Sequence, residues 1–193
     1  MRKVYLLEAK MKICIICGKP SFITLSSGEE ESDYCLDCYN ELLTNAYETN
    51  YDQFSPISFN FQDNEGILRE FEISKMILPV IVKWIAEEVE GNYKFELMAD
   101  LDDDDQYVIS KLKEKIIKGV NSKSLETKTF NGCDMLFLNQ KGVVNIEYDE
   151  NTDDLPRFII DGEVFTLEEF GRLLMTYEGY VLKYKIIEDS EDY

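Results

Sequence analysis

Four of the five cysteines form two closely spaced pairs near the start of the chain. The first pair is Cys14 and Cys17, the second is Cys35 and Cys38, and seventeen residues separate the pairs. Two residues between the cysteines of a pair let both sulfur atoms reach one ion. Two such pairs complete the tetrahedron of ligands that Zn²⁺ prefers. The spacing therefore predicts a closed, structural zinc site that holds one Zn²⁺ per chain.

The residues around the two pairs predict the local fold. Gly18 follows the first pair and permits the positive-φ backbone that a tight turn needs. Apolar residues at helical spacing follow the second pair and predict a helix whose first turn contains Cys38. A knuckle, a short hairpin and a helix in this order resemble the treble-clef class of zinc fingers, and the resemblance covers residues 12–48.

Two other uses of the cysteines compete with zinc binding. An iron–sulfur cluster also takes four thiolates and remains the main alternative for these ligands. A redox-active C-x-x-C motif usually stands alone in a thioredoxin-like unit, so two paired copies argue against that use. Cys133 follows Asn131 and Gly132 far from the quartet and is interpreted as a buried or incidental thiol.

The charge of the chain disfavours nucleic acid as a partner. With 20 basic and 39 acidic side chains, the formal net charge is −19, which a phosphate backbone would repel. Acidic residues also occupy the loop and second pair of the cysteine element. Only Lys10, Lys12 and Lys19 gather near the first pair. A zinc-ribbon nucleic-acid binder would need these few lysines to form a continuous patch.

The sequence predicts an intracellular, cytoplasmic protein without a membrane span. The most apolar run, residues 76–85, is interrupted by Pro79 and Lys83 and falls short of the roughly 18 residues that a span requires. Residues 1–10 lack the apolar core of a secretory signal. Met11 is a second candidate start, which leaves open whether residues 1–10 are native.

The rest of the chain predicts an α+β body with mainly antiparallel strands. We expect a cysteine element at residues 1–48 and an acidic domain at residues 56–193, with possible sub-units at 56–125 and 126–193. Alternating apolar residues predict a β-hairpin over residues 57–73 and a further strand over residues 93–97. Residues rich in helix formers predict a helix over Met76–Val89.

Acidic runs in the body have two competing interpretations. The run Asp102–Asp105 precedes apolar residues at helical spacing, so its carboxylates are expected to cap a helix, with a Mg²⁺ or Ca²⁺ site as the alternative. The run Asp149–Asp154 begins like a calcium loop. It lacks the required glycine at Asp154 and the bidentate glutamate at Ile160, so it predicts an acidic turn.

The C-terminal part carries clear local signals. Asp161-Gly162 predicts a hairpin turn, and Thr166 with Glu169 forms a capping box that opens a helix. That helix should present one apolar stripe, which we read as Leu167, Phe170, Leu174 and Tyr177. Alternation over Tyr180–Ile187 predicts a closing strand.

One family resemblance rests on these C-terminal residues. The stretches Ile160–Gly162, Glu169–Arg172 and Tyr177–Gly179, together with Lys183, resemble the C-terminal segment of a family of uncharacterised bacterial proteins. The resemblance covers roughly residues 140–190. It implies that such a segment is paired with an N-terminal cysteine-rich element, and it implies no function.

The absence of histidine removes the commonest general base and every Ser-His or Cys-His nucleophile system. No glycine-rich phosphate loop occurs either. A carboxylate-dependent hydrolase remains as an alternative, with Glu168, Glu169 and Glu178 near Asp161 in the sequence. Arg172 and Tyr177 are further candidates for a buried ion pair or a ligand contact. The C-terminal helix is expected to use them structurally.

The sequence thus favours a zinc-binding, non-enzymatic interaction protein. In this hypothesis zinc is structural, and the acidic body binds a basic protein partner. The alternatives are the carboxylate-dependent hydrolase and the zinc-ribbon nucleic-acid binder. Spacing alone does not say whether the cysteine element docks on the body or swings on the linker 48–55.

Overall fold

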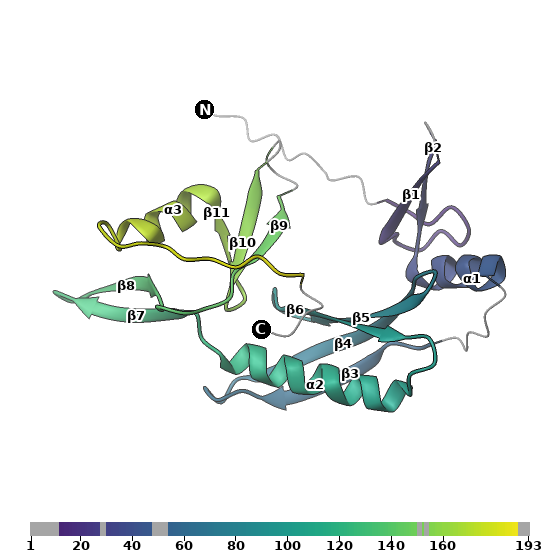
Figure 1. Cartoon of the computed structure of the whole chain (residues 1–193), viewed down its shortest axis with the longest axis horizontal. Coiled ribbons are helices and arrows are strands. Elements are labelled where there is room, and N and C mark those ends of the chain that lie inside the picture. Colours follow the sequence, from purple (N-terminus) through teal and green to yellow (C-terminus); the bar gives the residue numbers. More distant parts are fainter. Residues whose placement is uncertain (1–11, 28–29, 48–53, 150–151, 153–154, 189–193) are drawn as a thin grey trace.

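The protein has an α+β fold built from antiparallel sheets and helices, as predicted (Figure 1). The computed structural model describes residues 12–27, 30–47, 54–149, 152 and 155–188. The helices are α1 (Leu36–Tyr47), α2 (Asp105–Asn121) and α3 (Leu167–Met175). The strands, in chain order, are β1 (Ile23–Ser27), β2 (Glu30–Tyr34), β3 (Ile57–Gln62), β4 (Leu68–Ile77), β5 (Ile81–Glu88), β6 (Lys94–Asp100), β7 (Leu125–Phe130), β8 (Cys133–Leu138), β9 (Asn145–Tyr148), β10 (Pro156–Ile160) and β11 (Glu163–Thr166).

The N-terminal part is a small zinc-finger-like element. A single bridge between Ile13 and Pro20 closes the loop that carries the first two cysteines. The antiparallel hairpin β1–β2 follows, with Ile23 opposite Tyr34, and α1 comes directly after it. The element has few apolar residues to bury, so its cysteines lie where a larger domain would have a hydrophobic core.

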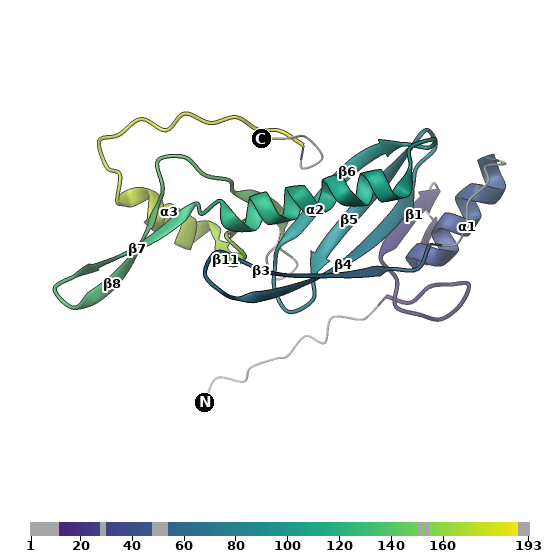
Figure 2. The same ribbon diagram turned by 90° about the horizontal axis from the view of Figure 1, so that it is seen from below.

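The body is centred on the antiparallel sheet β3-β4-β5-β6. Helix α2 covers one face of this sheet, and the main hydrophobic core lies between them (Figure 2). Alternate side chains of each strand point into that core, as period-2 geometry requires. The buried residues of the core are Phe71, Ile73, Val82, Trp84, Ala86, Tyr93, Phe95, Val108, Ile109, Leu112, Ile116 and Val120.

Helix α2 begins where the acidic run predicts it. Asp104 is the N-cap, and its side chain accepts a hydrogen bond from the Tyr107 N–H at 2.9 Å. This bond satisfies one of the donors left unpaired at a helix start. Asp105 lies in the first turn and Lys118 in the last, which complements the helix dipole. The capping interpretation of this run is therefore correct.

The helix predicted over Met76–Val89 is wrong. These residues form the end of β4, a turn at Pro79, and the whole of β5. In β5 the buried residues Val82, Trp84 and Ala86 alternate with partly exposed neighbours, which is a strand period. The sheet pairs β5 on both sides, and this non-local pairing outweighs the helix propensity of its alanine and glutamates.

The C-terminal part contains the sheet β9-β10-β11 and α3. Asp161 and Gly162 both have positive φ, at 51° and 79°, and form the predicted turn between β10 and β11. The capping box of Thr166 and Glu169 is present in full. Most of the expected apolar stripe is present, because Phe170, Leu174 and Tyr177 are partly buried and Phe170 stacks on Phe158. Leu167 is exposed instead, and Leu173 is the buried residue of α3.

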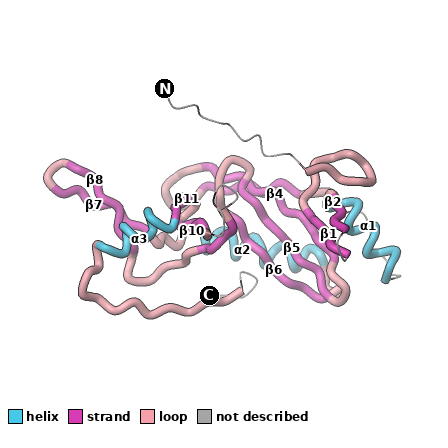
Figure 3. The backbone as a smooth tube through the Cα atoms, turned by 90° about the horizontal axis from the view of Figure 1, so that it is seen from above, coloured by secondary structure: helices cyan, strands magenta, loops and turns pink. Residues whose placement is uncertain are grey.

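Two further segments differ from expectation. β7 and β8 form an unpredicted hairpin that pairs with no other described strand and projects from the body (Figure 3). Its turn is Asn131-Gly132, and both residues have positive φ. The strand predicted over Tyr180–Ile187 is absent: these residues are an extended loop with exposed side chains. Their alternation is real, but no strand among the described residues pairs with them.

Candidate metal centre

The first cysteine pair lies on a tight turn held by backbone hydrogen bonds. The Cys14 N–H donates to the Lys19 carbonyl at 2.8 Å, and the Gly18 N–H donates to the Cys14 carbonyl at 3.0 Å. Gly18 has a φ of 74°, a conformation that a side chain would strain. A further bond from the Ile15 N–H to the Asp33 carbonyl, at 2.9 Å, ties this turn to β2. The hairpin thereby fixes the first pair in space.

The second pair is positioned by the start of α1. Cys35 directly precedes the helix, and the Tyr39 N–H donates to its carbonyl at 3.0 Å. Cys38 lies in the first turn, as predicted, one turn along from Cys35. Residues three apart lie on the same face of a helix, so both sulfur atoms turn toward the first pair.

The four sulfur atoms converge. All lie within 4.8 Å of one another, and those of Cys17 and Cys35 are 3.5 Å apart. A regular tetrahedron with metal–sulfur bonds of about 2.3 Å has sulfur atoms about 3.8 Å apart, so the donor set fits a tetrahedral metal ion. Cys14, Cys35 and Cys38 are buried, and Cys17 is exposed. The structure thus brings together all four residues that the spacing singled out.

The pKa values of these thiols favour binding of a cation at the cluster. Burial raises the pKa of Cys14, but hydrogen bonds from backbone N–H groups, led by that of Cys35, outweigh it and bring the pKa to about 6. Burial and the neighbouring thiols raise the pKa of Cys38 well above its usual range. One thiolate therefore forms readily, and its negative charge disfavours ionisation of the neighbouring thiols. A bound dication would remove this conflict, because metal ligation deprotonates cysteine.

The lysines near the first pair are engaged with carboxylates. The Lys19 ammonium lies 3.1 Å from Asp37, whose hydrogen bond and charge raise the lysine pKa. The Lys12 ammonium lies 3.6 Å from Asp33 and donates to the Thr24 hydroxyl at 3.1 Å. Lys10 lies outside the described residues. The described lysines thus form local ion pairs with the acidic residues of the same element.

The zinc-finger-like element is docked on the body through Asn40, a residue that the sequence did not single out. Its side-chain amide donates to the Lys75 carbonyl at 2.7 Å, and its carbonyl oxygen accepts from the Ile77 N–H at 2.9 Å. β3 pairs with β4 only as far as Ile73, so these backbone groups lie beyond the paired part of that edge. Asn40 is only 2% exposed and takes the place of a neighbouring strand.

The contact through Asn40 lies close to the cysteine cluster in α1. Asn40 is two residues after Cys38 in the same helix, and Tyr39 between them is also buried. A movement of the helix start that disturbs the cysteine cluster will therefore also disturb the hydrogen bonds between Asn40 and β4. No sequence signal marks Asn40, because its partners lie 35 and 37 residues away.

The carboxylates considered for metal binding or hydrolysis have structural roles. In the acidic run, Asp103 accepts from the Asp100 N–H at 2.9 Å, and Asp105 lies 2.7 Å from the Lys75 ammonium. In the C-terminal part, Asp161 accepts from the N–H groups of Ser124 and Leu125. These carboxylates therefore point at separate partners.

Three further candidates from the sequence have partners of their own. Glu168 pairs with Arg172 at 2.5 Å, Glu169 completes the capping box, and the Tyr177 hydroxyl donates to the Leu138 carbonyl. Cys133 is exposed at the start of β8, so the interpretation as a buried thiol is wrong. Among the described residues, the cysteine quartet is the one group of three or more cysteine, aspartate or glutamate side chains arranged closely enough to hold a metal ion.

Comparisons with known proteins match the body and leave the metal centre unmatched. Residues 52–121 match the domain of unknown function DUF7686, and residues 124–191 match the domain of unknown function DUF7713. Comparison with curated proteins and with solved structures gave no match. In the described part of the chain, no helix is long and apolar enough to span a membrane. The chain therefore joins a metal-ligand cluster to two segments that match families without an assigned function.

Proposed function

We propose that this protein binds one structural Zn²⁺ ion and serves as a non-enzymatic, acidic interaction protein. The convergence of four cysteine sulfur atoms at the junction of a turn, a hairpin and a helix is the observation that carries the proposal. Four protein ligands fill a tetrahedral ion and leave no position for a reacting molecule. The order of these elements is that of a treble-clef zinc finger.

Zinc is favoured over an iron–sulfur cluster for geometric reasons. A single ion needs its four sulfur ligands about 3.8 Å apart, whereas a cluster interposes several atoms between them and needs a wider set. The observed spread, up to 4.8 Å, matches the single ion more closely. Titration of the metal-free protein with Co²⁺ tests this, because a tetrahedral thiolate site gives intense visible absorption that one equivalent of Zn²⁺ should abolish.

An acidic face of the central sheet is the surface we assign to a basic partner. Glu70, Glu72 and Glu87 lie on the face opposite α2, and Glu72 is directly opposite Glu87 in the β4–β5 register. Like charges placed opposite each other destabilise a sheet. Lys94, 3.5 Å from Glu87, offsets part of that cost. A cationic partner would offset the rest and gain from long-range attraction by a chain of charge −19.

Binding of a labelled lysine- and arginine-rich peptide, followed by fluorescence anisotropy, tests the partner class. We expect binding that weakens as salt rises, and a loss of at least fivefold in affinity for the double variant Glu70→Gln, Glu72→Gln. The matched control is Glu163→Gln, Glu178→Gln, which changes the net charge equally at exposed positions elsewhere. No binding at low salt, or an equal loss in both variants, would refute the assignment of this face.

A further inference from the structure

The extended segment after α3, residues 180–187, exposes a continuous run of apolar side chains. Its backbone is extended, and no described strand pairs with it. Five of its large apolar side chains are each at least 68% exposed: Tyr180, Val181, Leu182, Tyr184 and Ile186. Four of these occupy alternate positions from Tyr180 and would form one face of a strand. Single apolar residues are common on protein surfaces, but a contiguous exposed patch usually marks an interaction site.

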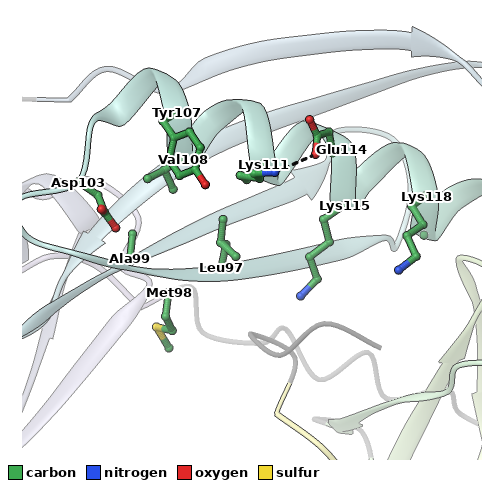
Figure 4. A pocket seen from close by; sticks show the side chains of 11 residues that line it. Leu97, Met98, Ala99, Asp103, Tyr107, Val108, Lys111, Glu114, Lys115 and Lys118 are labelled. Atoms are coloured by element: carbon green, nitrogen blue, oxygen red, sulfur yellow. Dashed lines mark hydrogen bonds and ion pairs between the residues drawn. The ribbon is translucent and has the colours of Figure 1, made fainter.

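The body of the same chain does not cover the extended segment. A groove of about 390 Å³ lies between β6 and α2, and Leu97 and Ala99 point into it, toward the helix (Figure 4). Met98 points to the other side of β6, and the described end of the segment lies on that side, opposite α2 (Figure 1, Figure 4). The extended segment therefore does not enter the groove. Its side chains up to Ile186 are exposed rather than packed on the sheet.

A turn after α3 sets the direction of the extended segment. The Tyr180 N–H donates to the Tyr177 carbonyl at 3.0 Å, and the two rings meet edge to face with their centroids 5.7 Å apart. Gly179, with a φ of 87°, lies in this turn, and the Tyr177 hydroxyl donates to the Leu138 carbonyl of β8. From the turn, the segment and β8 run in the same direction, toward the body, and Figure 2 shows them well separated. The extended segment of one molecule therefore lies away from its own hairpin.

The outer edge of β8 offers backbone groups to a further strand. Among the described strands, β8 pairs with β7 alone. The Leu138 carbonyl faces outward, because it accepts from the Tyr177 hydroxyl. Since the backbone groups of an antiparallel strand alternate, the N–H and C=O of Leu136 and Asp134 also face outward. Open edges of this kind are templates for addition of another strand.

The side chains beside this edge match the extended segment. Phe130 is 51% exposed and Met135 is 46% exposed, and the Phe130 ring lies 5.8 Å from the Phe137 ring on the same face of the hairpin. The opposite face carries Asp134 at this edge. In the extended segment, Lys185 lies between apolar residues and would point to the face opposite theirs. A strand added to β8 can therefore place its apolar row beside Met135 and a lysine beside Asp134.

We propose that two copies of this chain form a dimer in which each copy adds its extended segment to the β8 edge of the other. The segment and β8 of one molecule share a direction, so a two-fold axis perpendicular to that direction reverses the partner's β8. The added strand is then antiparallel to β8. Exchange in both directions gives a closed, symmetric dimer. This proposal is independent of the metal centre and of the acidic face.

Sedimentation equilibrium of the full chain, with its metal centre intact, tests the dimer. We expect a dimer that becomes monomeric when the chain ends at residue 179. For Leu182→Glu with Tyr184→Glu, the dissociation constant of the dimer should rise at least tenfold. The matched control is Leu68→Glu with Val80→Glu, which replaces exposed apolar residues elsewhere in the body and should change that constant less than twofold. A monomeric full chain, a dimer that survives truncation, or an equal rise in both variants would overturn the proposal.

A disulfide tests which strands pair and whether they belong to different copies. In the proposed register Lys185 lies opposite Asp134, and the next pair is Ile186 and Cys133. Under mild oxidation, Ile186→Cys should give a covalent dimer on a non-reducing gel, because opposite residues of an antiparallel pair lie within disulfide reach. The double variant Ile186→Cys, Cys133→Ser should give none. A cross-link within a single chain would mean that the segment pairs with its own hairpin, and a dimer without any cross-link would exclude this register. Both results contradict the proposal.

Discussion

The N-terminal element and the central sheet differ in how much apolar surface they bury. The sheet and α2 bury a continuous set of large apolar side chains, including Trp84 and Leu112. The N-terminal element buries chiefly its cysteines, and its Ile13, Ile15 and Ile16 are exposed. Small domains that lack a sufficient core commonly depend on a metal or a disulfide. Under the proposed function, the body is stabilised by burial of apolar side chains, and the N-terminal element is stabilised by bonds from its cysteines to the metal ion.

Removing two metal ligands should give the largest difference in stability between the two regions. For Cys35→Ser with Cys38→Ser, we expect the N-terminal element to unfold, because metal binding in such elements contributes on the order of 10–16 kcal/mol to folding. Hydrogen exchange should rise to the unfolded rate over residues 12–47, and it should also rise at Ile77, whose N–H loses its bond to Asn40. The amides of β5 should stay protected. The control is Cys133→Ser, which lies outside the cluster and should leave exchange unchanged. Protection of residues 12–47 in the double variant would contradict metal dependence.

A cavity in the hydrophobic core should destabilise the body and leave the metal centre intact. Leu112 is fully buried in the middle of α2, so Leu112→Ala should lower the free energy of unfolding of the body by about 2–5 kcal/mol. Chemical denaturation followed by the fluorescence of Trp84 measures this. The exposed residue Leu101 provides the control, since Leu101→Ala should cost far less. Metal content should not change, and a loss of metal in Leu112→Ala would mean that the two regions fold as one unit.

A buried ion network gives the stability of the body a pH dependence of its own. The Asp63 carboxylate accepts from the N–H groups of Glu65 and Ile67 and from Arg69, which also pairs with Glu88. Burial raises the pKa of Asp63, but these hydrogen bonds and the Arg69 charge outweigh it and lower the pKa. A lowered folded-state pKa stabilises the fold above the unfolded value, near 4, and this contribution is lost as the pH falls through the folded value.

Replacing that carboxylate makes the pH effect measurable. Asp63→Asn should cost about 1.5–3 kcal/mol at neutral pH, as expected for hydrogen bonds to a charged group. The difference between wild type and variant should shrink as the pH falls below about 4. Denaturation of both proteins at several pH values checks this. A difference that stays constant down to the acid limit would show that the charge of Asp63 is not the cause.

The smallest expected effect falls at the contact between the two regions. Asn40→Ala removes both hydrogen bonds to β4 and should cost roughly 1–2 kcal/mol. Exchange should rise at Ile77, whereas metal binding should persist. Asn45→Ala, exposed on the same helix, is the matched control. Unchanged exchange at Ile77 in Asn40→Ala would mean that the element is held on the body by other contacts.

The sequence predicted best what depends on near neighbours in the chain. The cysteine spacing, the Asp104 cap, the Asp161-Gly162 turn and the capping box at Thr166 each involve residues a few positions apart. Asn131-Gly132, the turn between β7 and β8, is a local hairpin signal of the same kind. Such features depend on interactions between neighbouring residues, so they can be predicted from the sequence without knowledge of the fold.

What the sequence did not predict depends on pairing between distant residues. β5 became a strand because β4 and β6 flank it, and the alternating residues 180–187 lack a described strand partner. Asn40 and the groove beside β6 arise only when segments far apart in the chain meet. Alternation in a sequence predicts a strand, but a strand forms only where another strand offers an edge.

Metal content tests the central claim most directly. Elemental mass spectrometry of protein purified without chelators should find one zinc per chain, and the Cys35→Ser, Cys38→Ser variant should contain none. Iron with visible absorbance in the wild type would contradict the account, because the quartet would then hold an iron–sulfur cluster. A wild-type chain with no metal but a folded, protected N-terminal element would contradict it as well.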